Sequence, residues 1–159
     1  MPSVMKDLYP NGMVVRLRSK NNKYLFAGED KISVTLVESD SSENVRWTVE
    51  FSYESDDIFR LKSCYGRYLT PSNQPFLLGL TGRKVLQMAS RLDSSVEWEL
   101  VEEGKDWVKL ITRDGSFLRA NGGLPPWKDT VTHDVPWAFQ DLVLWDVQPV
   151  EIGDICVIL

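Results

Sequence analysis

The feature that most constrains the fold of this chain is a segment that occurs three times with the same spacing. The copies cover residues 15–25, 59–69 and 108–118, and they align without a gap. In each copy a leucine is followed seven residues later by an aromatic residue and a second leucine, as in Leu17 before Tyr24-Leu25. Apolar and small residues alternate with polar ones, which predicts a half-buried β-strand because successive side chains point to opposite faces.

Each copy also predicts a tight turn after this strand. The aligned positions between the strand and the aromatic residue hold Asn22, Gly66 and Gly115. These residue types tolerate the positive φ that hairpin turns require. Each copy is therefore expected to form a β-hairpin.

A second repeated mark closes each unit. Trp47, Trp98 and Trp145 each begin an alternating segment, and they follow the three hairpin segments in order. The chain then divides into a lead-in at residues 1–13, three units at about 14–52, 58–103 and 107–150 within a domain of 14–152, and a tail at 153–159. Each unit holds about four strand candidates, and the insertion at 71–84, with two prolines and two glycines, is expected to be a shaped loop rather than a strand.

The threefold repeat predicts an all-β fold of the β-trefoil type. No apolar stripe with helical spacing is sustained, so we expect almost no helix. Units this small cannot bury their own apolar faces and must pack around a common axis. In a trefoil, about twelve strands form a short six-stranded barrel and three hairpins that cap it. A propeller normally needs more blades, and a β-sandwich, the alternative, does not require threefold similarity.

Composition narrows the functional classes. The net charge of -5 over 159 residues argues against a nucleic-acid partner, because affinity for nucleic acid comes largely from Lys and Arg on phosphates. The two cysteines lie far apart, and the sequence shows no signal-peptide pattern, glycosylation sequon or membrane-length apolar run. We expect a single cytoplasmic domain with reduced thiols.

Several longer motifs give a family resemblance. They are Arg46-Trp-Thr-Val-Glu-Phe51, Tyr65-Gly-Arg-Tyr-Leu-Thr70, Thr81-Gly-Arg-Lys-Val-Leu-Gln87 and Phe117-Leu-Arg-Ala-Asn-Gly-Gly-Leu-Pro-Pro-Trp127. Over about residues 14–152 the chain resembles a plant domain family of unknown function that is grouped with the fascin-like, actin-crosslinking β-trefoils. The resemblance implies a trefoil and, by analogy of fold, a protein partner such as actin filaments. One trefoil would decorate a filament, or bundle filaments only as a dimer.

The candidate catalytic residues favour structural roles. His133 stands alone, with neither a metal-binding cluster nor a triad around it. Glu97 and Glu99 alternate with Trp98, which predicts plain solvent exposure rather than a pair of catalytic carboxylates. The sequence therefore predicts a protein that is not an enzyme and needs no cofactor.

The candidate binding surface combines basic and aromatic side chains. Its members are Arg16, Arg18, Lys20, Lys23, Phe76, Trp127 and Trp137. The basic residues also fit the ordinary solvated face of a strand and its turn, and the loop at 122–127 also fits a packed cover over the barrel end. Two functions follow: a protein-interaction module, or a lectin-like module that holds a carbohydrate or other small ligand in the loops at 74–80 and 122–127. The oligomeric state is left open.

The sequence ends in Cys156-Val-Ile-Leu159, which matches the prenylation pattern, and a final leucine favours a geranylgeranyl group. The alternative is that the apolar end forms a last strand. One lipid normally needs a second membrane signal, and the residues just upstream are acidic. We therefore expect any membrane association to be reversible or dependent on a protein partner.

Overall fold

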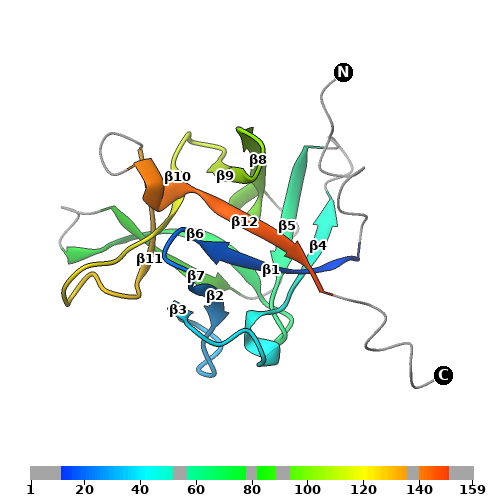
Figure 1. The fold of residues 1–159 in the computed structure, drawn as a ribbon, viewed down its shortest axis with the longest axis horizontal. Helices are drawn as coiled ribbons and strands as arrows, with labels where there is room; N and C mark the ends of the chain where they lie inside the picture. The colour runs from blue at the N-terminus through cyan, green and yellow to red at the C-terminus, as the bar shows by residue number, and fades with distance from the viewer. Residues whose placement is uncertain (1–11, 52–56, 78–81, 89–93, 136–139, 151–159) are drawn as a thin grey trace.

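Six strands form a closed barrel. The computed structural model describes residues 12–51, 57–77, 82–88, 94–135 and 140–150. Antiparallel pairing runs from β1 through β4, β5, β8, β9 and β12 and returns to β1, so none of the six strands is left with a free edge. Figure 1 shows β1 and β12 side by side. The barrel strands are β1 (Val14–Ser19), β4 (Trp47–Phe51), β5 (Ile58–Lys62), β8 (Trp98–Glu103), β9 (Trp107–Thr112) and β12 (Trp145–Pro149).

The other six strands form three hairpins that cap the barrel. β7 pairs with β11, and isolated bridges join Ser33 to Leu86 and Thr35 to Thr130, so the three hairpins contact one another. Their strands are β2 (Tyr24–Ala27), β3 (Val34–Val37), β6 (Tyr68–Pro75), β7 (Arg83–Met88), β10 (Phe117–Ala120) and β11 (Val131–Asp134). The β-trefoil predicted from the repeats is confirmed, and within the described ranges the helical residues are confined to short 3-10 turns.

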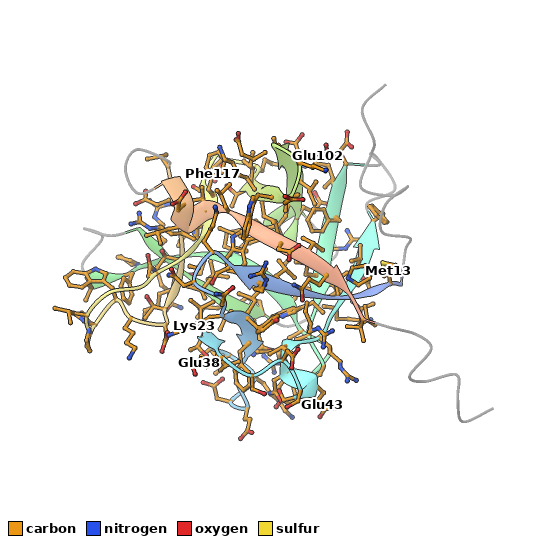
Figure 2. All side chains as sticks on the ribbon, viewed as in Figure 1. Met13, Lys23, Glu38, Glu43, Glu102 and Phe117 are labelled. Carbon is orange, nitrogen blue, oxygen red and sulfur yellow. The ribbon has the colours of Figure 1, made fainter. Side chains whose placement is uncertain are left out.

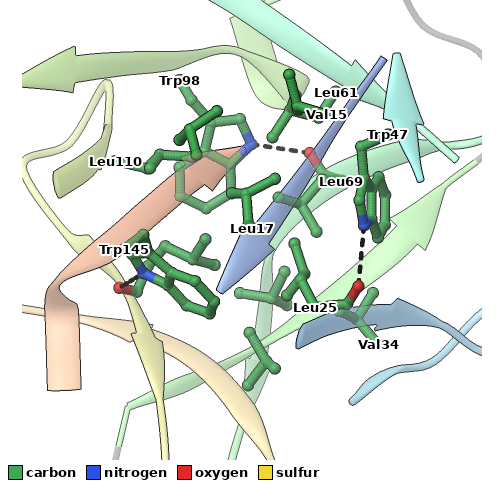
Figure 3. Close-up of a cluster of buried hydrophobic side chains, with 14 of the residues drawn as sticks. Val15, Leu17, Leu25, Val34, Trp47, Leu61, Leu69, Trp98, Leu110 and Trp145 are labelled. Carbon is green, nitrogen blue, oxygen red and sulfur yellow. Dashed lines mark hydrogen bonds between the residues drawn. The ribbon is translucent and has the colours of Figure 1, made fainter. Parts of the chain in front are cut away.

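In each unit, a hydrogen bond joins the repeated tryptophan to the repeated aromatic-leucine pair. Trp47, Trp98 and Trp145 are at most 1% exposed. Each indole N–H donates to the backbone carbonyl of the leucine in its own unit's aromatic-leucine pair, as Figure 3 shows. The bonds run from Trp47 to Leu25 (3.1 Å), from Trp98 to Leu69 (2.9 Å) and from Trp145 to Leu118 (3.0 Å). Each unit therefore closes on itself around a buried indole.

A short 3-10 turn precedes each of these tryptophans. The turns are η1 (Glu43–Val45), η3 (Ser94–Val96) and η4 (Gln140–Val143). Each includes a valine two residues before the tryptophan, and Val45, Val96 and Val143 are all buried. The repeated Val-x-Trp spacing signals this turn. In the third unit Leu142 and Val143 belong to η4, and β12 begins at Trp145.

The predicted hairpin turns are present in all three units. Asn22, Gly66 and Gly115 have φ of 61°, 76° and 87°. Their backbone N–H groups donate to the carbonyls of Ser19, Ser63 and Thr112, at 3.0, 2.9 and 3.0 Å. The positive φ explains why these aligned positions hold only asparagine and glycine.

The insertion at 71–84 differs from the expected loop. β6 continues to Pro75 and pairs with β7, with a register shift between Pro71 and Pro75. Proline lacks a backbone donor, and the side chain of Ser72 supplies a contact by donating to the carbonyl of Lys84 at 2.7 Å. The prediction failed because a strand tolerates proline where the ladder is irregular.

Candidate functional site

A cleft opens where the β8–β9 hairpin diverges from β12. The only register pair between β9 and β12 in the described chain joins Val108 to Trp145, whereas β8 and β9 stay paired to the end of their hairpin. The cleft has a volume of about 630 Å³, which is within the range of small-molecule sites. It is lined by Arg18, Leu100, Glu102, Gly104, Lys105, Asp106, Trp107, Val108, Asp146 and Val147; Figure 2 labels Glu102 near the end of β8. We call it the Trp107 cleft.

The Trp107 cleft has an apolar base and a polar rim. Leu100, Val108 and Val147 belong to the barrel core or pack against it. Trp107 is half-buried at the start of β9. The Lys20 ammonium lies 4.5 Å and the Arg18 guanidinium 5.6 Å from the centroid of its ring, which is cation–π distance. These contacts restrain the indole at the edge of the cleft.

Arg18 and Asp146 form the fixed polar pair of the cleft. They are direct partners across β1 and β12, and Arg18 Nη2 lies 3.1 Å from Asp146 Oδ2. Gln148 Nε2 donates to the same oxygen at 2.8 Å, and Arg18 also donates to the side chain of Asn22. Among the described residues these contacts with Asp146 all fall on Oδ2, so Oδ1 can accept a hydrogen bond from a ligand. The pair is thus held in place before any ligand arrives.

This combination occurs in one of the three equivalent places around the barrel. The positions that align with Trp107, Asp146 and Arg18 hold Val14, Thr48 and Lys62 in one repeat, which we call the Val14 row. In the next repeat they hold Ile58, Glu99 and Ile111, which we call the Ile58 row. A smaller cleft of about 210 Å³ lies over the Ile58 row. Its lining includes the buried Trp98 and the Glu97–Arg113 ion pair, but the position that aligns with Trp107 is aliphatic and the positions that align with Arg18 and Asp146 do not form an ion pair. The fold repeats these three positions in each unit, but they hold an aromatic residue and an ion pair in one unit alone.

The predicted basic residues are distributed over different contacts. Arg18 and Lys20 lie at Trp107, whereas Arg16 Nη1 donates to the carbonyl of Asp40 at 3.2 Å. Lys23 forms an ion pair with Asp129 on the β10–β11 loop. The four basic side chains therefore do not form one free basic face.

The predicted aromatic residues also separate. Trp127 is 39% exposed on the β10–β11 loop, and its neighbour Leu124 is 77% exposed. Phe76 is half-buried just after β6, where its N–H donates to the carbonyl of Gly82. Trp137 lies outside the described residues, so its role stays a prediction.

The β10–β11 loop is anchored beneath its exposed side chains. Asn121 is buried, and its side-chain amide donates to Thr130 Oγ1 at 3.1 Å and to Thr132 Oγ1 at 3.0 Å. The backbone N–H of Trp127 donates to the carbonyl of Leu124. The loop thus presents two apolar side chains to solvent from a fixed base.

His133 has a structural place. It is 7% exposed, and its Nε2 donates to the backbone carbonyl of Ser72 at 2.7 Å, which ties β11 to β6. Burial lowers the pKa of His133, although the bond to the Ser72 carbonyl opposes this shift. Within the ranges that the structure describes, no three His, Cys, Asp or Glu side chains are grouped to hold a metal ion.

The expected exposure of Glu97 was wrong. Its side chain is 11% exposed and receives Arg60 Nη1 at 3.4 Å and Arg113 Nη2 at 3.3 Å. Arg60 itself is buried, so Glu97 serves as its counterion. Glu99 is exposed, as the alternation predicted.

Sequence reasoning missed Trp107 as a candidate. A usable signal was present, since Trp107 aligns with Val14 and Ile58 and therefore breaks the threefold pattern that Trp47, Trp98 and Trp145 obey. A large aromatic residue at a position that the repeat does not require is a better candidate for binding than one that recurs in every unit.

The proposed lipid site cannot be placed. Cys156 lies outside the described residues, so its prenylation stays a prediction, and the described cysteine, Cys64, is exposed and free. Among the residues that the structure describes, no helix is long and apolar enough to span a bilayer.

Comparison with solved structures gives the same architecture at low sequence identity. A designed threefold-symmetric protein, ThreeFoil, matches with a TM-score of 0.70 and 18% identity, covering 86% of this chain and 99% of that one. A ricin B-like lectin from Macrolepiota procera, solved with lactose, has a TM-score of 0.68 and 16% identity, covering 87% and 96%. A Polyporus squamosus lectin bound to a sialylated glycan epitope has a TM-score of 0.68 and 19% identity, covering 89% of this chain and half of that one. These likenesses establish the fold.

Comparison at the level of families is more specific. No match was found among curated protein sequences. A family model for a β-trefoil domain of unknown function matches residues 6–145, which is most of the chain. The match leaves the expected plant origin and fascin grouping as predictions. The chain belongs to the DUF569 family of β-trefoil domains of unknown function.

Proposed function

We propose that this protein is a non-catalytic binding module that holds a carbohydrate in the Trp107 cleft. The observation that carries the proposal is the placement of an indole, an apolar base and a fixed Arg18–Asp146 pair around one opening of about 630 Å³. A sugar ring has C–H groups on its faces and hydroxyl groups at its edge. An aromatic wall beside convergent donors and acceptors matches both parts of that surface.

Two further observations support this class of ligand. The lectins named above share the trefoil, and one is solved with lactose and the other with a glycan epitope. The titratable group with the strongest initial claim to catalysis, His133, is committed to a backbone carbonyl under the cap. Both points favour binding over turnover.

The test combines a glycan array with calorimetric titration of the glycans that bind. Trp107→Ala is expected to abolish binding, and Asp146→Asn to weaken it by about threefold to tenfold through loss of a charged hydrogen bond. Trp127→Ala, which removes an exposed tryptophan outside the cleft, is the matched control and should bind as the wild type does. Circular dichroism confirms that each variant folds. Array silence, or equal binding by Trp107→Ala, would overturn the proposal.

A second candidate function rests on the β10–β11 loop. Leu124 and Trp127 are exposed on an anchored loop, and exposed aromatic and aliphatic side chains are typical anchors of protein interfaces. A protein partner is the corresponding proposal, and the fascin-like resemblance suggests actin filaments. Cosedimentation with filaments at high and low centrifugal force tests it, with Trp127→Ala beside Trp107→Ala. Pelleting that only Trp127→Ala loses would support this function, and no pelleting of the wild type would remove actin as the partner.

A further inference from the structure

The charges around the Trp107 cleft decide which carbohydrates it can hold, given the proposed function. Lining residues Arg18 and Lys105 are positive, and Glu102, Asp106 and Asp146 are negative. Lys20, above the Trp107 ring, adds one more positive charge, so three positive groups face three negative ones. The charges balance, and Trp107 is the one aromatic residue among the three aligned positions. We therefore propose that the cleft binds one neutral saccharide per chain.

The unpaired charges argue against a charged ligand of either sign. Arg18 and Asp146 neutralise each other. Among the described residues no ion pair engages Lys20, Lys105, Glu102 or Asp106. A negatively charged uronate placed beside the lysines would also face Glu102 and Asp106. A positively charged amino sugar placed beside these acidic residues would also face the lysines. Neither gains a net attraction, and both lose hydration that a neutral sugar does not have to give up.

The hydrogen-bonding capacity of the fixed pair suits hydroxyl groups. A guanidinium carries five N–H donors, and the contacts of Arg18 with Asp146 and Asn22 leave some of them available. Asp146 keeps Oδ1 as an acceptor. A hydroxyl group can accept from Arg18 and donate to Asp146 at once, whereas a carboxylate can only accept and an ammonium can only donate.

The number of sites follows from the three equivalent rows. The Val14 row and the Ile58 row have no aromatic residue at the position of Trp107. The cleft over the Ile58 row is lined by Trp98, which is 1% exposed, and it has about one third of the volume of the Trp107 cleft. We therefore expect a molar ratio of one sugar to one chain, although the fold has threefold symmetry. Such a protein binds glycans without crosslinking them unless it forms oligomers.

The test uses matched methyl hexosides of glucose, galactose and mannose, each as the neutral sugar, the uronate and the 2-amino sugar. Calorimetry on the full chain should give a stoichiometry of one for a neutral member, with binding that changes little between low and high salt. Both charged members of that series should bind about two- to fivefold more weakly, as expected for exposed charge pairs. Asp106→Asn should narrow the gap for the uronate, and Lys105→Met should narrow it for the amino sugar.

The outcomes separate this inference from the proposed function. A uronate or amino sugar that binds more tightly than the neutral sugar, with binding still lost in Trp107→Ala, would overturn the neutral class while the cleft stands. A stoichiometry of two or three would overturn the single site. Failure of every sugar to bind the wild type would overturn the proposed function and this inference with it.

Discussion

Replacing one of the three buried tryptophans with phenylalanine tests the bond that closes each unit. Trp98→Phe keeps an aromatic ring but removes the N–H that donates to the Leu69 carbonyl at 2.9 Å. Trp98 is 1% exposed, so water cannot replace the lost donor. The unpaired carbonyl costs about 1–3 kcal/mol, and the space left by the smaller ring adds about 1 kcal/mol. We expect the free energy of unfolding to fall by about 2–4 kcal/mol, which lowers Tm by roughly 5–15 °C for a domain of this size.

Urea unfolding followed by far-ultraviolet circular dichroism measures this change, with a linear extrapolation to water. Because Trp47 and Trp145 make the same bond to Leu25 and Leu118, their phenylalanine variants should agree with Trp98→Phe within about 1 kcal/mol. Trp127→Phe, at an exposed position, should change stability by less than about 0.5 kcal/mol. A Trp98→Phe variant as stable as Trp127→Phe would refute the reasoning, and so would wide disagreement among the three buried positions.

Three further predictions concern other parts of the chain. Burial holds the pKa of His133 below 6.5, so the unfolded chain binds a proton at a higher pH than the folded chain, and the free energy of unfolding should fall as pH drops below about 6.5. In urea titrations between neutral and mildly acidic pH, the free energy of unfolding of His133→Gln should fall less steeply with pH than that of the wild type, and equal slopes would contradict this. Gly82 and Gly115 have similar φ values, +90° and +87°, but an added Cβ would lie 2.8 Å from the His133 carbonyl oxygen at Gly82 and in open space at Gly115. Thermal melts should therefore show Gly82→Ala to be less stable than Gly115→Ala by about 1–3 kcal/mol, and equal losses of stability would contradict the close approach. Mass spectrometry after expression in eukaryotic cells should find a geranylgeranyl group on Cys156 that Cys156→Ser lacks, and an unmodified wild type would exclude it.

The fold was predictable because its determinants are local and repeated. Leu17, Leu61 and Leu110 recur with the same spacing to their turns, and all three are buried. The turn positions and the closing tryptophans recur as well, so each unit confirms the interpretation of the other two. Sequence could not show that each indole donates to the leucine carbonyl of its own unit, because that contact depends on how the hairpin folds back under the barrel.

The candidate site was predicted only in part, for a physical reason. Arg18 and Lys20 were singled out, but their partners Trp107 and Asp146 are far away in the sequence and meet them only through the pairing of β1, β12 and β9. Alternation along β12 places Asp146 on the face opposite Trp145, but it does not show that Arg18 lies directly across from it. Outward-facing residues vary between units, so the repeat that revealed the fold carries no information about the one row that differs.

The most direct test of the central claim is the indole region of a ¹H–¹⁵N correlation spectrum during titration with a neutral saccharide from the array. The Trp107 peak is assigned by its absence in Trp107→Phe. Binding in the cleft predicts that the Trp107 peak shifts with saturation, while the peaks of Trp47, Trp98 and Trp145 stay in place because those indoles are buried and bonded to backbone carbonyls. A shift at Trp127 with an unmoved Trp107 peak would contradict the account.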